Sequence, residues 1–140
     1  MIHIVIDTNV IYSGLFSIDG ASHILLKGIG IMDFTLHISV PVVFEYEEVL
    51  KKNKRLLGLT DKDIEDFIKY ICKVSEKHEI YYLWRPVLKD PKDEVFLELA
   101  VTSGCDYIIT YNKRDFVQAK QFNVGILTPK EFLGKTGALK

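Results

Sequence analysis

Four acidic side chains, far apart in the sequence, stand where they could form one site. Asp7 and Asp115 each follow an apolar run that has the composition of a buried strand, and Glu45 and Asp93 lie in segments with helical periodicity. Four carboxylates brought together repel one another, and hard divalent cations such as Mg²⁺ or Mn²⁺ relieve that repulsion. The chain has no matching set of histidines and cysteines, which argues against zinc.

A carboxylate site that holds Mg²⁺ mostly serves phosphate chemistry. One ion activates a water for in-line attack, and a second, ~3.5–4 Å away, stabilises the leaving oxygen. The residues alone are compatible with a metal-dependent nuclease or a phosphatase. RNA enters only through the family resemblance described below, which leaves open a ribonuclease, an RNA-binding module with little catalysis, and a phosphatase or DNA nuclease on a similar sheet.

Two of the four acids have simpler explanations that the sequence leaves open. Asp7 could do no more than cap a short helix over 9–16, because Asp accepts bonds from free N–H groups at a helix start. Glu45 lies on the edge of the apolar stripe of a helix over 41–52, where a long side chain can reach solvent. Neither residue is therefore assigned to a site on its own.

The other two acids have comparable alternatives. Asp93 projects onto the centre of an apolar helical face, where an unpaired charge is costly, but it could make a second capping bond back to Asp90. Asp90 itself has the position of an N-cap, followed by Pro91, and is explained by that role. Asp115 could cap a helix over 116–121.

The expected elements alternate between strand and helix with short links, which favours an α/β fold with a parallel sheet and helices on both faces. If the first and fourth strands are neighbours, their carboxyl ends form the crevice where such sheets bind ligands, and all four acids can meet there. The expected strands are 2–6, 34–40, 80–84, 106–110 and 123–127. The expected helices are 9–16, one capped by Ser22 and ending at Gly28 to Gly30, 41–52, one opened by a Thr60–Asp63 capping box and running to about His78, one from Asp90, 116–121, and a last turn through Leu133.

Composition and charge limit the possible partners. A chain of 140 residues with 48% hydrophobic and 26% charged residues is one globular domain, here expected over 1–134 with a frayed tail at 135–140. Its net charge of −1 gives no general attraction to nucleic acid, so any such affinity must be local. Cys72 and Cys105 are expected to be free thiols in a reducing compartment. No signal peptide or membrane span is recognisable, so a cytoplasmic protein is expected.

Two basic groups are candidates for phosphate contacts. Lys113 and Arg114 flank Asp115 and are the better candidates. The other group follows the third helix and consists of Lys51, Lys52, Lys54 and Arg55.

Four motifs together resemble the PIN-domain family, small metal-dependent ribonucleases that include the toxins of bacterial and archaeal toxin–antitoxin pairs. They are Asp7-Thr8-Asn9-Val10, Glu45-Tyr46-Glu47-Glu48-Val49-Leu50, Asp90-Pro91-Lys92-Asp93-Glu94 and Thr110-Tyr111-Asn112-Lys113-Arg114-Asp115-Phe116. The resemblance covers nearly the whole chain. Each motif is weak alone, but their order and spacing make the set specific.

The resemblance implies a role for each matched residue. Asp7, Glu45, Asp93 and Asp115 would form the acidic, metal-binding and catalytic centre. The residues that would orient substrate or tune the site are Thr8, Asn9, Thr110 and Asn112. Family members often have Gly-Asp where this chain has Tyr111-Asn112, so the number of Mg²⁺ or Mn²⁺ ions, one or two, stays open.

The resemblance also implies a fold and partners. The fold would be a three-layer α/β/α sandwich with a five-stranded parallel sheet in the order 3-2-1-4-5. The substrate would be single-stranded or structured RNA, an antitoxin protein would block the acidic groove, and the chain would form a homodimer. From the residues alone, Phe44 on the otherwise polar side of its helix is a weak indication of a protein interface.

Overall fold

Five parallel strands form one sheet in the order β3-β2-β1-β4-β5, as predicted, in a computed structural model that describes residues 1–79, 88 and 90–137. The strands are β1 (Ile2–Ile6), β2 (Phe34–Ser39), β3 (Glu76–His78), β4 (Tyr107–Ile109) and β5 (Gly125–Leu127). The chain order reverses at β1, which lies between β2 and β4. This is the switch point at which the sequence analysis expects a site.

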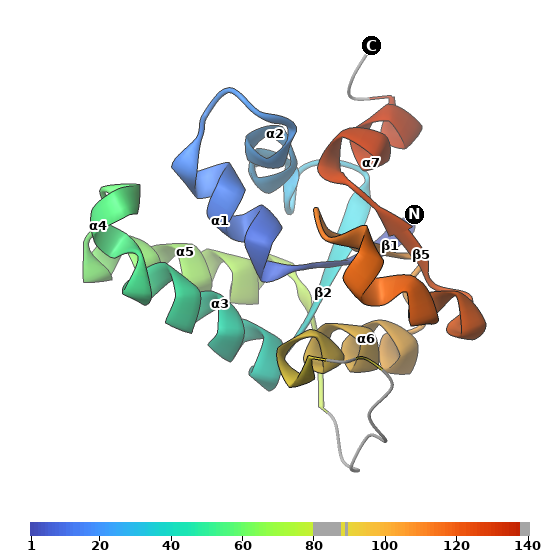
Figure 1. Cartoon of the computed structure of the whole chain (residues 1–140). Coiled ribbons are helices and arrows are strands. Elements are labelled where there is room, and N and C mark those ends of the chain that lie inside the picture. Colours follow the sequence, from blue (N-terminus) through green and yellow to red (C-terminus); the bar gives the residue numbers. More distant parts are fainter. Residues whose placement is uncertain (80–87, 89, 138–140) are drawn as a thin grey trace.

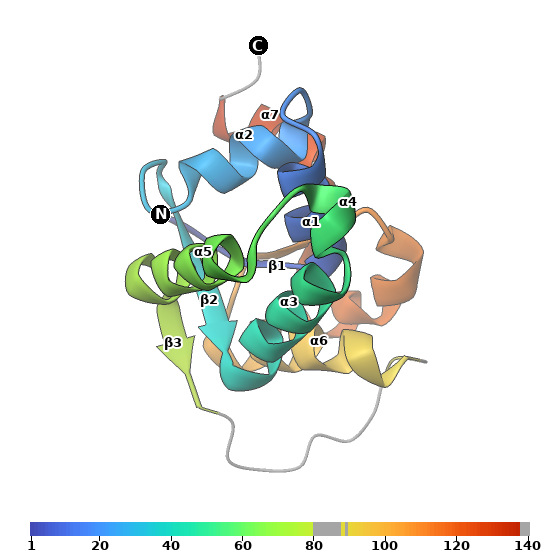
Figure 2. The same cartoon turned by 90° about the vertical axis from the view of Figure 1, so that its left-hand side faces the viewer.

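Helices cover both faces of this sheet, which gives the predicted three layers. Figures 1 and 2 show α2 and α7 together on one face and α6 on the opposite face. The helical elements are α1 (Thr8–Phe16), α2 (Ala21–Gly28), α3 (Val40–Lys52), α4 (Lys54–Leu57), α5 (Asp61–Val74), α6 (Pro91–Ser103), the 3₁₀ segment η1 (Lys113–Phe122) and α7 (Pro129–Thr136). Within the described ranges, each helix is too short or too polar to cross a membrane.

The buried core fixes the end of β1 relative to α3. Ile4, Val5 and Ile6 are fully buried, as expected for a strand covered on both faces. The hydroxyl of Tyr46, which is fully buried on α3, donates a hydrogen bond to the Ile6 carbonyl. This bond fixes the middle of α3 beside Ile6, the residue that precedes Asp7.

The predicted helix to about His78 is wrong, because α5 ends at Val74. Its opening is as predicted, with both bonds of the Thr60–Asp63 capping box present. Ser75 is extended, and Glu76–His78 then pairs with β2 as strand β3. The apolar periodicity of the helix stops within α5, so nothing stabilises a further turn against strand pairing. The strand predicted at 80–84 lies outside the described residues.

Other boundaries differ from those predicted. The segment expected as a helix over 116–121 is a longer 3₁₀ helix with non-helical torsions at Phe116. Ser22 does not cap α2; Gly20 holds that position, and the Ser22 hydroxyl instead bonds to the Tyr111 hydroxyl. The short helix α4 was not predicted. At the other end of the chain, α7 continues past Gly134 to Thr136. Both cysteines are free, as expected.

Candidate active site

Asp7 lies at the carboxyl end of β1 and is held by both of its carboxylate oxygens. Its side chain is only 6% exposed. The Thr8 N–H donates to Oδ1 at 2.7 Å, and the Thr110 hydroxyl, at the end of β4, donates to Oδ2 at 2.7 Å. Asp7 is therefore the cap of α1, and it is also fixed by the neighbouring strand. The capping role does not exclude a role in a site.

The charge on Asp7 is unfavourable in this environment. Burial raises the pKa of Asp7, and the two hydrogen bonds from Thr110 and Thr8 oppose that rise. The nearby carboxylates of Asp115 and Glu45 raise the pKa further. A cation bound here would offset the unfavourable charge of a buried carboxylate that has two others nearby.

Asp93 shows the largest effect of this kind. It lies in the first turn of α6, and burial, followed by the carboxylates of Asp7, Asp90 and Asp115, raises its pKa from 3.8 to about 7. Its connection to Asp90 joins backbone groups, the Asp93 N–H and the Asp90 carbonyl, at 3.0 Å. The alternative in which its carboxylate caps the helix has no such bond in the part of the chain that the structure describes.

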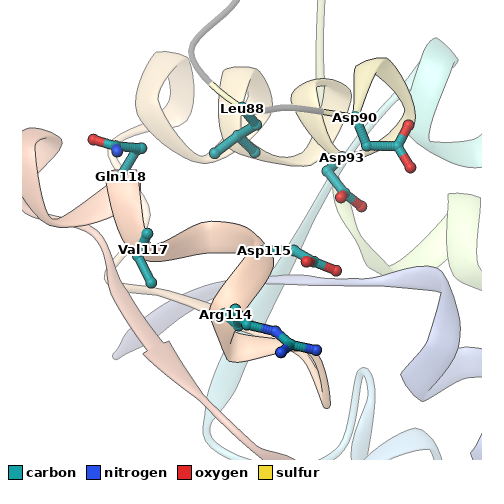
Figure 3. Close-up of a pocket in the computed structure, with 7 residues that line it drawn as sticks. All are labelled: Leu88, Asp90, Asp93, Arg114, Asp115, Val117 and Gln118. Carbon is teal, nitrogen blue, oxygen red and sulfur yellow. The ribbon is translucent and has the colours of Figure 1, made fainter.

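Asp115 comes to the same place from η1. Its side chain is exposed, and Figure 3 shows its carboxylate and that of Asp93 extending toward the same space. The carboxylate of Asp115 contributes to the raised pKa of both Asp7 and Asp93. The structure therefore brings together three of the four predicted acids: Asp7, Asp93 and Asp115.

Glu45 lies at the edge of this group. Burial raises the pKa of Glu45, with a further rise from Glu48 and Asp90 and an opposing effect from Lys92. Glu45 acts on the pKa of Asp7 but is not among the groups that act on Asp93. Glu45, the fourth predicted acid, thus interacts with Asp7 but not with Asp93.

Asp90 is a component that the sequence analysis missed as a site residue. Its predicted capping role is correct, since its carboxylate accepts the Lys92 N–H at 2.9 Å. The same carboxylate lines the cavity beside Asp93 and raises the pKa of Asp93 (Figure 3). Two aspartates three residues apart at a helix start lie on one side of the helix, and that spacing was the available signal.

A cavity of about 700 Å³ opens beside the acids. Its lining combines acidic, basic and apolar side chains: Leu88, Asp90, Asp93, Arg114, Asp115, Val117 and Gln118 (Figure 3). Acids line one side, while Leu88 and Val117 add apolar surface. Phosphate chemistry would occur on the acidic side of the cavity, and the surface next to that side is apolar.

The candidate phosphate-binding residues differ in their availability. Arg114 lines the cavity and makes no ion pair in the described ranges. Lys113 instead points to α7, where its ammonium bonds to both carboxylate oxygens of Glu131 at 3.0 and 3.2 Å. In the earlier basic group, Lys51 and Lys54 have acidic partners, at 4.0 Å and 3.1 Å. Arg114 is thus the best placed cation.

The smaller polar residues fix the loop that leads from β4 to η1 and Asp115. The Thr110 hydroxyl accepts the Asn112 N–H at 3.0 Å while donating to Asp7. The Asn9 side-chain oxygen accepts the Tyr111 N–H at 3.4 Å. These bonds connect the residues that follow β4 to Asp7 and to Asn9 in the first turn of α1.

The acids fit a hydrated Mg²⁺ or Mn²⁺ ion rather than a closed cage. Across residues 1–79, 88 and 90–137, no group of three or more Asp, Glu, His or Cys side chains is placed to hold a metal ion by itself. Mg²⁺ usually keeps several waters and binds through one or two carboxylates, which such an open group can supply. The Thr8 hydroxyl is buried beside Asp7 and has no hydrogen-bond partner among the described residues.

Comparisons with known proteins add independent findings. A sequence model described as "PIN domain" matches residues 3–114. A search of curated proteins finds no match. Two solved structures share the fold. One is a crystal structure of VapBC2 from Rickettsia felis bound to a DNA fragment from their promoter (TM-score 0.62, 12% identity, 91% of this chain and 98% of that chain). The other is a domain of a functionally unknown protein from Methanocaldococcus jannaschii (TM-score 0.55, 17% identity, 91% of each chain).

Proposed function

Because the chain belongs to the PIN domain family, we propose that it is a metal-dependent endoribonuclease and the toxin component of a toxin–antitoxin pair. PIN domains are generally nucleases, and the finer assignment depends on the site. The observation that carries it is the meeting of Asp7, Asp93 and Asp115, where burial, followed by the neighbouring carboxylates, raises the pKa of Asp93 to about 7. Such a group of acids is suited to a divalent cation and a phosphodiester.

Each residue of the site has a proposed part in the reaction. Asp7, Asp93 and Asp115 would hold one or two Mg²⁺ or Mn²⁺ ions, with Glu45 and Asp90 adding negative charge at the edge. The bound metal would supply an activated water for in-line attack on phosphorus and a charge that stabilises the leaving oxygen. Thr110 keeps Asp7 in one orientation through its hydroxyl bond.

RNA binding is assigned mainly to Arg114. Its guanidinium can form two parallel hydrogen bonds to a phosphate, and it lines the cavity beside Asp115. Because the whole chain is nearly neutral, such a local contact is needed to hold a polyanion. Thr8 and Asn9 are proposed to orient water and substrate around Asp7.

The test is cleavage of a mixed-sequence single-stranded RNA with Mn²⁺, with Mg²⁺ and with EDTA. Asp7→Asn is compared with wild type and with the control Asp33→Asn, an exposed acid outside the site. We expect metal-dependent cleavage in wild type and control, and a loss of at least ~100-fold in Asp7→Asn with the fold intact by circular dichroism. Equal cleavage by all three proteins would indicate a contaminating ribonuclease and would leave no support for the assignment.

A second candidate function is an RNA-binding module with little catalysis. Two observations favour it: Asn112 stands where family members often have an acid, and the described acids form no closed metal cage. It predicts RNA binding that survives both EDTA and Asp93→Asn, without cleavage. A phosphatase or DNA nuclease is separated from both by testing RNA, single-stranded DNA and a small phosphomonoester side by side.

Partners are proposed from the family and from one fold neighbour. That neighbour was solved as VapBC2, and an antitoxin partner for this chain is proposed by analogy with that complex. A homodimer is also proposed. The exposed Phe44 and Val40 on α3 offer apolar surface for one of these contacts. Light scattering at working concentration tests the dimer, and a strict monomer would exclude it.

A further inference from the structure

Three histidines from three neighbouring strands form a continuous row of ring-to-ring hydrogen bonds. Nδ1 of His3 lies 2.8 Å from Nε2 of His37, and Nδ1 of His37 lies 2.6 Å from Nε2 of His78. The ring centroids are 5.0 Å and 4.9 Å apart. The row connects β1, β2 and the edge strand β3. None of its three histidines has a role in the proposed active site.

The strand register produces this row. His3 pairs with Thr35, which places His37 two residues further along β2 on the same face. His37 pairs with Glu76, which places His78 two residues further along β3. Each ring therefore meets the next one diagonally across the sheet.

Counting protons shows how the row responds to acid. Each link needs one hydrogen between its two ring nitrogens, and three neutral rings supply both links when their tautomers point the same way. One added proton is tolerated on any of the three rings. A charged His37 donates in both directions, and a charged His3 or His78 donates to His37 while its second N–H points out of the row. A second added proton must place two N–H groups face to face in one link, so that link breaks.

The middle ring is poorly placed to take that first proton. His37 is only 3% exposed. Burial lowers the pKa of His37, as do the rings of His78 and His3, while Glu76 and Asp106 oppose this effect. A charge on His37 is therefore disfavoured, and the row loses a link when it takes up two protons.

Further charged groups around the row come from the segments packed against it. The carboxylate of Asp106 accepts a hydrogen bond from the backbone N–H of His3 at 2.8 Å. Cys105 lies near Asp106 and Glu76, and burial raises the pKa of its thiol to about 11, so it stays neutral. The carboxylates of Glu76 and Asp106 are thus the groups that would partly stabilise a charged ring.

Strand β3 is the element that depends most on this row. It has three residues, it lies at the edge of the sheet, and its pairing to β2 is supplemented by the bond between His37 and His78. We propose that His3, His37 and His78 form a proton-operated latch that fixes β3 to the sheet and releases it on acidification. Strand β5 is the matched reference, because it is also a three-residue edge strand but contains no histidine.

The test is amide hydrogen exchange of the wild-type protein at about pH 7.5 and about pH 5, expressed as protection factors. We expect protection in β3 to fall roughly fivefold on acidification, the factor that corresponds to the net contribution of one hydrogen bond. Protection in β5 should stay unchanged. Equal losses in β3 and β5 would overturn the latch, because a general acid effect acts on both edges.

Variants separate the row from other titrating groups. His37→Phe removes both links, and His78→Gln keeps an amide donor at the outer end without a titrating ring. In both, protection of β3 should become independent of pH over this range. The control His23→Gln changes a histidine outside the row, which bonds to the Gly14 carbonyl, and should keep the wild-type response. If β3 keeps its pH dependence in His78→Gln, the row is not the sensor. The wild-type comparison of β3 with β5 remains decisive if His37→Phe does not fold.

Discussion

Asp7 illustrates what residue types can and cannot predict. Its helix-capping role is local and follows from the sequence alone. Its second contact, to Thr110, depends on β1 and β4 being neighbours, and more than 100 residues separate the two. The two roles are compatible because one carboxylate has two oxygens. Asp90 was missed as a site residue because its role as the helix N-cap already explained its place in the sequence.

The raised pKa of Asp93 predicts a pH-dependent effect on stability. The folded protein holds this proton more tightly than the unfolded chain, so the contribution is favourable near pH 4 and is lost as the pH rises to about 7. In EDTA, Asp93→Asn should therefore raise the free energy of unfolding at about pH 8 by about 2 kcal/mol, after allowance for solvent screening. Near pH 4 the effect should vanish.

Urea denaturation at both pH values measures this difference, with Asp33→Asn as the exposed control. A gain of stability that is the same at both pH values would contradict the electrostatic explanation.

Arg114 and Lys113 provide a matched pair for RNA binding. Arg114 faces the cavity, whereas Lys113 is bonded to Glu131. Arg114→Gln should weaken binding to RNA and lower the slope of log affinity against log salt by about 1, with a smaller change in Lys113→Gln. Fluorescence anisotropy over a salt series, in the Asp7→Asn background, measures both. Equal effects of the two substitutions would show that Arg114 has no special position.

At the scale of elements, segments with a clear apolar or capping pattern were predictable, and segments without one were not. The apolar run of β1 and the capping box of α5 identify their elements directly. Strand β3 reads Glu-Lys-His, which has no apolar alternation, so its pairing with β2 is decided by tertiary contacts. Segment η1 deviates from an α-helix at Phe116, which is fully buried, and such a distortion has no sequence signature.

The contact between α1 and α2 depends on a glycine. A Cβ at Gly14 would lie 2.5 Å from Leu26 Cδ1 and 2.9 Å from the Ser22 carbonyl oxygen. Gly14→Ala should therefore destabilise the protein by about 1–3 kcal/mol, because the backbone of α2 must move.

The control, Gly134→Ala in α7, meets no atom within 4 Å and should stabilise the protein by about 0.5–1 kcal/mol. Denaturant midpoints measure both. The same sign for the two variants would rule out a close approach of helices as the cause.

For the whole molecule, the alternation of strand and helix predicted a parallel sheet with helices on both faces, whereas the strand order was predicted from the resemblance to the PIN-domain family. The three layers form as expected (Figure 1), and the strand order reverses at β1, whose carboxyl end carries Asp7. What remained out of reach was which acids are central. That depends on how far α3 and α6 extend over the sheet, and it leaves Glu45 at the edge.

Metal binding should stabilise the whole fold. A ligand at about 100 times its Kd adds about 2.7 kcal/mol, which for a domain of this size raises Tm by roughly 5–10 °C. We expect this rise with Mn²⁺ in wild type and in Asp33→Asn, and its loss in Asp93→Asn, by differential scanning fluorimetry. An equal rise in Asp93→Asn would place the ion elsewhere.

The order of the acids along the chain has a consequence for synthesis. Asp7 leaves the ribosome first, but β1 receives its partner β4 only after residues 107–109 have been made, and Asp115 follows later still. An activity that needs all of these carboxylates cannot exist in a shorter nascent chain. Under the proposed function, a nascent chain could therefore begin to cleave RNA only after Asp115 has been made.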